Sequence, residues 1–155
     1  RYLCAPPAVL DVIKVKKIAS VFADKPLLTA AEAFAENKQK TLIVYDHGRM
    51  SGVINSYKLY GEIAARAKRG DDATAFLTGA RCGDILSPAD LTGYMLVGRD
   101  ATVVDVFTAF EKHKDLIAVI VTESGVLGEK VLTIITPSDF PRINRYLENY
   151  NVKPF

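Results

Sequence analysis

The sequence predicts a domain of the α/β (α+β) class, in which two tandem β-α-β-β-α repeats pack face to face with pseudo-two-fold symmetry. Two observations predict this fold. A helical pattern occurs twice at one constant offset, and a short apolar strand pattern follows each copy. A repeat of this size leaves one sheet face uncovered, and packing two copies against each other buries both faces.

The two helical patterns cover residues 24–38 and 100–114. In the first, apolar residues recur at helical spacing. Pro26 suits the first helical position, because the N–H that proline lacks would be unpaired there. The second segment repeats the pattern. The matching pairs are Asp24 and Asp100, Ala33 and Ala109, Phe34 and Phe110, and Lys38 and Lys114.

The strand patterns that follow are nearly continuous β-branched runs at residues 41–45 and 117–121, which is typical of strands buried on both faces. Each run continues through a glycine-containing turn into another strand, as expected for a hairpin. The remaining predicted elements are second hairpin strands at 50–55 and 130–136, lead-in strands at 20–22 and 94–97, and closing helices at about 56–68 and 137–147.

The order of these elements predicts the organisation of the chain. We expect an N-terminal segment, a first repeat, a linker marked by polar residues, a second repeat and a C-terminal tail. Because the chain begins at Arg1 without a methionine, we also expect either a piece of a larger protein or an undisplayed start. The predicted boundaries are 1–14, 15–70, 71–80, 81–147 and 148–155.

Composition excludes several functional classes. Of 155 residues, 49% are hydrophobic and 25% charged, which is typical of a folded domain. The 20 basic and 18 acidic residues give a net charge of +2, too weak a field to predict binding to nucleic acid or to a membrane surface. No apolar run approaches the roughly 20 residues that span a bilayer. Cys4 and Cys82 are isolated and form no disulfide framework, which favours a cytoplasmic location.

Catalytic and metal chemistry find little support. The only histidines, His47 and His113, have no metal-ligand spacing with either cysteine. A Cys82–His113 nucleophilic pair is conceivable, but nothing in the sequence recommends it. The chain also lacks a P-loop and a Gly-x-Gly-x-x-Gly motif. We therefore expect no enzyme activity, no catalytic residue and no metal site.

The sharpest local motif is Thr136-Pro137-Ser138-Asp139, at a predicted strand-to-helix junction. One interpretation is a well-capped helix, with Thr136 as N-cap and Asp139 at the acidic position of a capping box. The other is a ligand site, because a helix N-terminus attracts phosphate and a carboxylate accepts hydrogen bonds from ribose hydroxyls. The motif itself leaves both interpretations open.

With these motifs in place, the chain resembles a tandem pair of cystathionine-β-synthase (CBS) domains, also called a Bateman module. The resemblance covers about residues 15–147 and is carried by residues 84–86, 99–103 and 132–140. It implies a regulatory module that senses an adenine nucleotide or another adenosyl compound in a cleft between the repeats. The implied ligands are AMP, ADP, ATP or S-adenosylmethionine. We also expect a homodimer, as is common for such pairs.

The resemblance also implies the site residues. Asp139 would bind the ribose hydroxyls, and Thr136 would bind ribose or phosphate. Lys16 or Lys17 could neutralise phosphate, but a free surface lysine is the favoured interpretation of each. Because the site of such a pair is composite, further residues are implicated around the base and on the opposite repeat. These are Ile134, Ala19, Gln39 and Thr41.

The first repeat departs from the family pattern. Asn55 replaces Ser or Thr, and Lys58 replaces the ribose-binding Asp, so a nucleoside cannot be held in the same way because lysine accepts no hydrogen bond. In the second repeat, Thr133 replaces the glycine that Gly52 keeps. We therefore expect at most one functional site per chain. The alternative is a ligand-free dimerisation or docking module of a larger protein.

Overall fold

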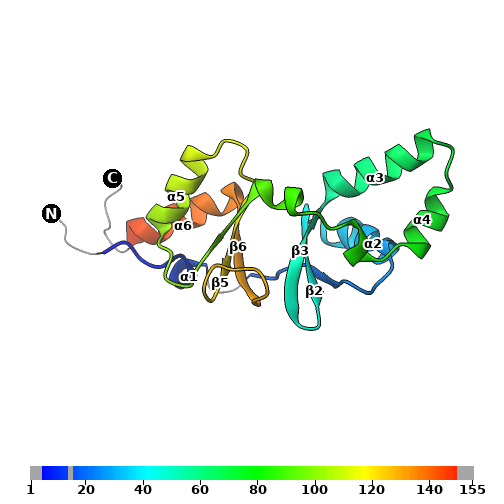
Figure 1. Cartoon of the computed structure of the whole chain (residues 1–155). Coiled ribbons are helices and arrows are strands. Elements are labelled where there is room, and N and C mark those ends of the chain that lie inside the picture. The colour runs from blue at the N-terminus through cyan, green and yellow to red at the C-terminus, as the bar shows by residue number, and fades with distance from the viewer. Residues whose placement is uncertain (1–4, 14–15, 150–155) are drawn as a thin grey trace. The chain divides into compact units, whose positions relative to one another are not determined.

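The computed structural model describes residues 5–13 and 16–149 (Figure 1). The chain divides into two compact units. One consists of Ile18–Leu91, and the other combines Arg1–Lys17 with Thr92–Phe155. Each unit holds one three-stranded sheet and its own helices. The N-terminal segment is therefore part of the unit that contains the second repeat.

In the unit Ile18–Leu91 the strand order is β1-β2-β3. The first two strands are parallel, and the second and third are antiparallel. The parallel pair is joined through helix α2, and the chain leaves the last strand directly into α3. The elements are β1 (Ser20–Phe22), α2 (Leu27–Asn37), β2 (Thr41–Asp46), β3 (Arg49–Asn55), α3 (Ser56–Lys68), α4 (Ala73–Gly79) and the 3₁₀ turn η1 (Cys82–Ile85); η2 (Pro88–Gly93) crosses into the other unit.

The other unit has the same topology, with strand order β4-β5-β6 and the same parallel and antiparallel pairing. Even the irregularities correspond, because a register shift falls between Val44 and Tyr45 in one sheet and between Val121 and Thr122 in the other. The duplicated order of elements is confirmed. The elements are α1 (Val9–Val12), β4 (Tyr94–Val97), α5 (Val103–Lys112), β5 (Ala118–Thr122), β6 (Val131–Ile135), the 3₁₀ turn η3 (Pro137–Asp139) and α6 (Phe140–Asn149).

Two details differ from the sequence predictions. Pro26 precedes the first helical residue and has an extended ψ of 149°, because it forms a β-bridge to Arg81 before α2 begins. The segment 71–80, for which we predicted a linker, contains α4. Asp72 caps this helix by accepting hydrogen bonds from the backbone N–H groups of Thr74 and Ala75.

The core of the unit Ile18–Leu91 lies between its sheet and α2, with α3 and η1 closing its edges. Leu27 and Ala30 of α2 are fully buried, and so are Leu42 and Val44 of β2. Cys82 of η1 belongs to the same cluster. Burial raises the pKa of the Cys82 thiol, so this cysteine packs as a small apolar side chain and is not poised as a nucleophile.

In the other unit, residues before and after the first repeat build one core together. Val9 and Ile13 are fully buried against the cluster that also contains Val119 and Ile135. The backbone secures this packing, since the N–H of Val9 donates to the carbonyl of Ala101 at 2.9 Å. The short helix α1 was not predicted, because four residues are too few to show helical periodicity.

An aromatic cluster fixes the start of α6. The ring of Phe140 lies edge-on to Phe107 at 4.9 Å between centroids and to Phe110 at 5.3 Å, both of them on α5. Such edge-to-face pairs stabilise the fold by more than the burial of their apolar area alone. Figure 1 shows α5 and α6 side by side against the β4–β6 sheet. The residue before Phe140 is Asp139, so the cluster lies directly next to the candidate site residue in the sequence.

The long β5–β6 loop is closed by the side chain of Glu129. Its Oε1 atom accepts hydrogen bonds at 2.8 Å from the backbone N–H of Ser124 and from the hydroxyl of Thr122. These two bonds lower the pKa of Glu129. Because the pKa of the folded state is lowered, this contribution to stability is present at neutral pH and is lost as the pH falls through that pKa.

Two buried threonines of this sheet provide a first prediction. Thr133 Oγ1 is buried without a hydrogen-bond partner among the described residues. The equally buried Thr122 Oγ1 donates a hydrogen bond to Glu129 and accepts one from the N–H of Gly125. Thr133→Val therefore removes an unpaired polar group and should raise the free energy of unfolding by about 1 kcal/mol. Thr122→Val should lower it by about 1–3 kcal/mol. Urea denaturation measures both. Equal losses in the two variants would contradict the prediction.

Candidate functional site

The candidate site is built on the junction where β6 passes into α6. Thr136 is extended, with φ −120° and ψ 166°, and η3 then turns the chain into the helix. The Thr136 N–H donates to Asp139 Oδ2 at 2.9 Å, and the Asp139 N–H donates to the Thr136 carbonyl at 2.9 Å. The capped-helix interpretation of this motif is therefore confirmed. The cap fixes the carboxylate without using all of its acceptor capacity.

Lys16 is the second charged group of the junction. Its ammonium Nζ lies 2.5 Å from Asp139 Oδ2 and also donates to the backbone carbonyl of Ile134. The two side chains are only partly accessible, with exposed fractions of 26% for Lys16 and 12% for Asp139. The solvated-lysine alternative is thus wrong for Lys16, because its ammonium has an acidic partner within the same unit.

The contacts of Asp139 fall unevenly on its two oxygens. In the described part of the chain, every hydrogen bond and ion pair of this carboxylate is made by Oδ2, which also lies 3.5 Å from the hydroxyl of Thr136. That hydroxyl is 2.7 Å from Ser138 Oγ. With respect to the described residues, Oδ1 therefore retains both of its lone-pair directions as acceptors for a further donor.

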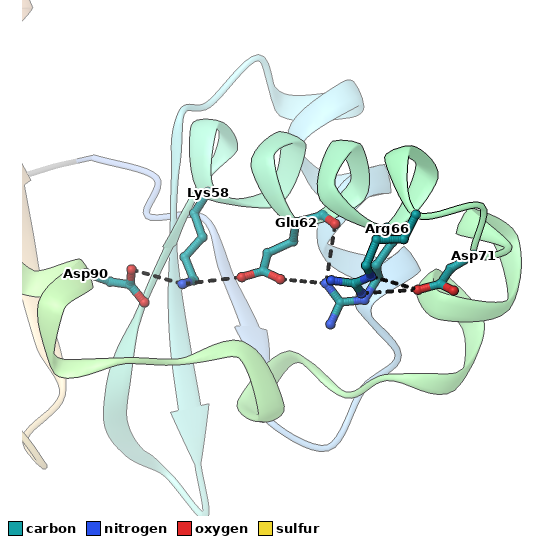
Figure 2. A network of polar contacts seen from close by, with 6 residues as sticks. Lys58, Glu62, Arg66, Asp71 and Asp90 are labelled. Atoms are coloured by element: carbon teal, nitrogen blue, oxygen red, sulfur yellow. Dashed lines mark hydrogen bonds and ion pairs between the residues drawn. The ribbon is translucent and has the colours of Figure 1, made fainter.

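The first repeat has a different arrangement at the equivalent junction. The side chain of Asn55 accepts the N–H of Lys58 at 2.8 Å and caps α3 in the manner of a helix N-cap. The ammonium of Lys58 lies 3.1 Å from Asp90 Oδ1 and 3.8 Å from Glu62 Oε1 (Figure 2). Lys58 is therefore paired internally where the second repeat carries Asp139.

This ion pair continues as a row of charges along α3. Glu62 also contacts Arg66 at 2.6 Å (Figure 2). The guanidinium of Arg66 lies 3.7 Å from the centre of the Phe76 ring on α4. The row ties α3 to α4 and to the segment that contains Asp90. The sequence analysis missed Asp90, because a single acidic residue in an irregular stretch has no periodic pattern that would mark it.

The remaining predicted site residues belong to two groups. Ile134 lies on β6 beside the junction and provides the carbonyl that Lys16 contacts. Ala19, Gln39 and Thr41 lie in the other unit, where the Ala19 carbonyl accepts the N–H of Ile43 and Thr41 begins β2. The structure thus brings Ile134, Thr136 and Asp139 together.

Other candidates for chemistry remain unsupported. Within residues 5–13 and 16–149, no three His, Cys, Asp or Glu side chains gather in a way that could hold a metal ion. His47 pairs with the neighbouring Asp46 in an exposed hairpin turn. Cys4 lies outside the described residues. Over the same described ranges, no helix combines the length and apolar character needed to cross a bilayer.

Comparisons with known proteins agree with this fold. No protein-family model and no curated protein sequence matches the chain. Among solved structures, the chain is similar to the AcuB protein of Vibrio cholerae, with 18% identity and a TM-score of 0.68 over 97% of this chain and 100% of that one. It is also similar to the CBS domain of a membrane protein from Sphaerobacter thermophilus, with 16% identity and a TM-score of 0.63 over 89% and 88% of the two chains.

A further similar structure is the CBS domain pair of protein MJ0100, solved in complex with 5′-methylthioadenosine and S-adenosyl-L-methionine. Its identity is 19% and its TM-score 0.58, over 92% of this chain and 98% of that one. The chain has the mixed α+β fold of a tandem CBS domain pair, as the sequence predicted.

Two capping boxes in one unit allow the Lys16–Asp139 pair to be tested. Asp105 caps α5 through the N–H of Thr102 at 2.8 Å, just as Asp139 caps η3, but it has no lysine partner among the described residues. Asp105→Ala should cost about 1 kcal/mol of unfolding free energy, as cap removal usually does. Asp139→Ala should cost about 1 kcal/mol more, because it also leaves the Lys16 ammonium without its counter-charge.

Chemical denaturation in wild-type and Lys16→Met backgrounds measures this difference. In the Lys16→Met background the two alanine variants should lose the same unfolding free energy relative to Lys16→Met itself, because each then removes only a cap. An unchanged difference between them would show that Lys16 does not stabilise Asp139.

Proposed function

We propose that the chain is a regulatory module that binds an adenine nucleotide or another adenosyl compound at the junction of β6 and α6. The observation that carries this proposal is the position of Asp139. Its carboxylate is held at a helix start by the Thr136 N–H, and its Oδ1 atom accepts no hydrogen bond within the described residues. A fixed acceptor of this kind suits the hydroxyls of a ribose.

Thr136 and Ile134 complete the part of the site that this unit provides. The helix start contributes partial positive charge, which favours a phosphate or another anionic group. Ile134 is almost fully buried and could provide an apolar surface for a base. The structurally similar pair of MJ0100 was solved with two adenosyl compounds, which supports this class of ligand. Ala19, Gln39 and Thr41 stay candidates for the same ligand.

The equivalent junction of the first repeat is not expected to bind a nucleoside. Lys58 cannot accept a hydroxyl proton, and its ammonium is already paired with Asp90 and Glu62. One ligand per chain is therefore the proposed stoichiometry. In this proposal the module acts by binding and not by catalysis, and it works in the cytoplasm as a homodimer.

The internal ion pairs favour a second candidate function. Both junction residues, Asp139 and Lys58, already have oppositely charged partners within their own units. A chain that satisfies these charges internally needs no ligand to do so. It could therefore act as a ligand-free dimerisation or docking module of a larger protein.

Ligand-induced stabilisation distinguishes the two candidates. Thermal unfolding is followed with AMP, ADP, ATP and S-adenosylmethionine, each tested separately over a range of concentrations. A bound ligand at about a hundred times its Kd should add roughly 2.7 kcal/mol of stability. Asp139→Asn should abolish this increase, because the amide can still accept the Thr136 N–H but loses the charge and one acceptor.

Asp105→Asn serves as the matched control, since it makes the same chemical change in the capping box of α5. It should keep the full ligand-induced increase. If none of the four compounds stabilises the wild-type chain, the docking function replaces the sensing function. If both Asn variants still respond to the ligand, binding occurs away from Asp139.

A further inference from the structure

We propose that Lys16 makes this site selective for adenosyl ligands that carry a phosphate, over neutral nucleosides and over the cationic S-adenosylmethionine. This inference rests on the proposed function, because it concerns the ligand class of the same site. It begins from the pairing of Lys16 with Asp139, at 2.5 Å, within a junction that would otherwise receive a ribose.

The acceptor positions of the Asp139 carboxylate limit how a ribose can bind. A carboxylate offers about two lone-pair directions on each oxygen. On Asp139 Oδ2, one is taken by the Thr136 N–H and another by the Lys16 ammonium. The two adjacent hydroxyls of a ribose can span both oxygens only if one Oδ2 position becomes free. The inferred binding mode uses both oxygens, and because the Thr136 N–H is fixed by the backbone of the cap, Lys16 is the donor that leaves.

The displaced ammonium needs a new partner. Lys16 loses its contacts with Asp139 and with the Ile134 carbonyl together, and only 26% of its side chain is exposed to solvent. A partly buried charge that loses its partners needs a new one. A phosphate on the incoming ligand supplies it, whereas adenosine supplies none. S-adenosylmethionine brings a positively charged sulfonium near the same place.

The start of α6 works in the same direction. The partial positive charge of a helix N-terminus is unfavourable for an ammonium and favourable for a phosphate. The Lys16–Asp139 ion pair therefore competes with ligand binding. A phosphorylated ligand compensates the Lys16 ammonium for its lost partner, whereas a neutral ligand leaves that charge unpaired and binds less tightly. Lys16 also lies two positions before Ile18, where the other unit begins. This exchange takes place next to a covalent junction between the units.

Calorimetric titrations of the whole chain with AMP, adenosine and S-adenosylmethionine test the proposal. Wild type should bind AMP about tenfold or more tightly than adenosine, which corresponds to one strong charge-assisted contact. In Lys16→Met, adenosine and S-adenosylmethionine should bind several-fold more tightly and AMP more weakly. The ratio of the adenosine Kd to the AMP Kd should therefore fall to about one. Lys16→Gln should behave in the same way, because it also removes the charge.

Lys17→Met is the matched control. This neighbouring lysine is exposed and has no hydrogen-bond or ion-pair partner among the described residues, so the variant should keep the wild-type preference. Thermal unfolding confirms that each variant is folded before titration.

Three results would overturn the inference. If both Lys16 variants keep the wild-type preference, Lys16 does not select the ligand, although the proposed function stands. If they weaken AMP and adenosine equally, Lys16 has only a structural role. If neither wild type nor the variants bind any of the three compounds, and ADP and ATP give no thermal stabilisation, the proposed function fails as well.

Discussion

The hydrogen bond from the Thr136 N–H to Asp139 is the interaction on which the candidate site depends. It closes η3, directs the chain from β6 into α6, and sets the orientation of the carboxylate. Phe140, the next residue, is held between two aromatic rings of α5. The same few residues therefore end a strand, start a helix and present a charged group. Structural and ligand-binding demands on this segment are difficult to separate for that reason.

The two repeats show how one scaffold can carry opposite charges at an equivalent position. In the second repeat an acidic residue at the helix start pairs with Lys16, which lies four residues before β1. In the first, Lys58 at the helix start pairs with Asp90, which lies four residues before β4. In both, the partner comes from the segment that leads into a strand. The fold thus keeps the ion pair while exchanging the two signs.

The sequence predicted the repeats well because their signals are local and duplicated. The lead-in strands at 20–22 and 94–97 and the helix at 56–68 were placed at their observed bounds. The Thr136–Asp139 cap was also visible, because its geometry depends only on residues three positions apart. The partners of Asp139 and Lys58 were less accessible. Lys16 lies 123 positions away from Asp139 and Asp90 follows no pattern, so only tertiary packing brings these charges together. Helices α1 and α4 are short, and tertiary contacts stabilise them more than periodicity does.

The packing of Val9 and Ile13 has a consequence for how the protein is made. These residues are synthesised before both repeats, yet the core that buries them is completed by β5, β6 and α6, which are synthesised after the first repeat. During translation the first repeat can fold before the second repeat is complete. Until then the apolar side chains of the N-terminal segment stay exposed to water. Such a delay exposes hydrophobic surface to other nascent chains. The order of synthesis therefore makes early chaperone contact most useful at the N-terminal end of this chain.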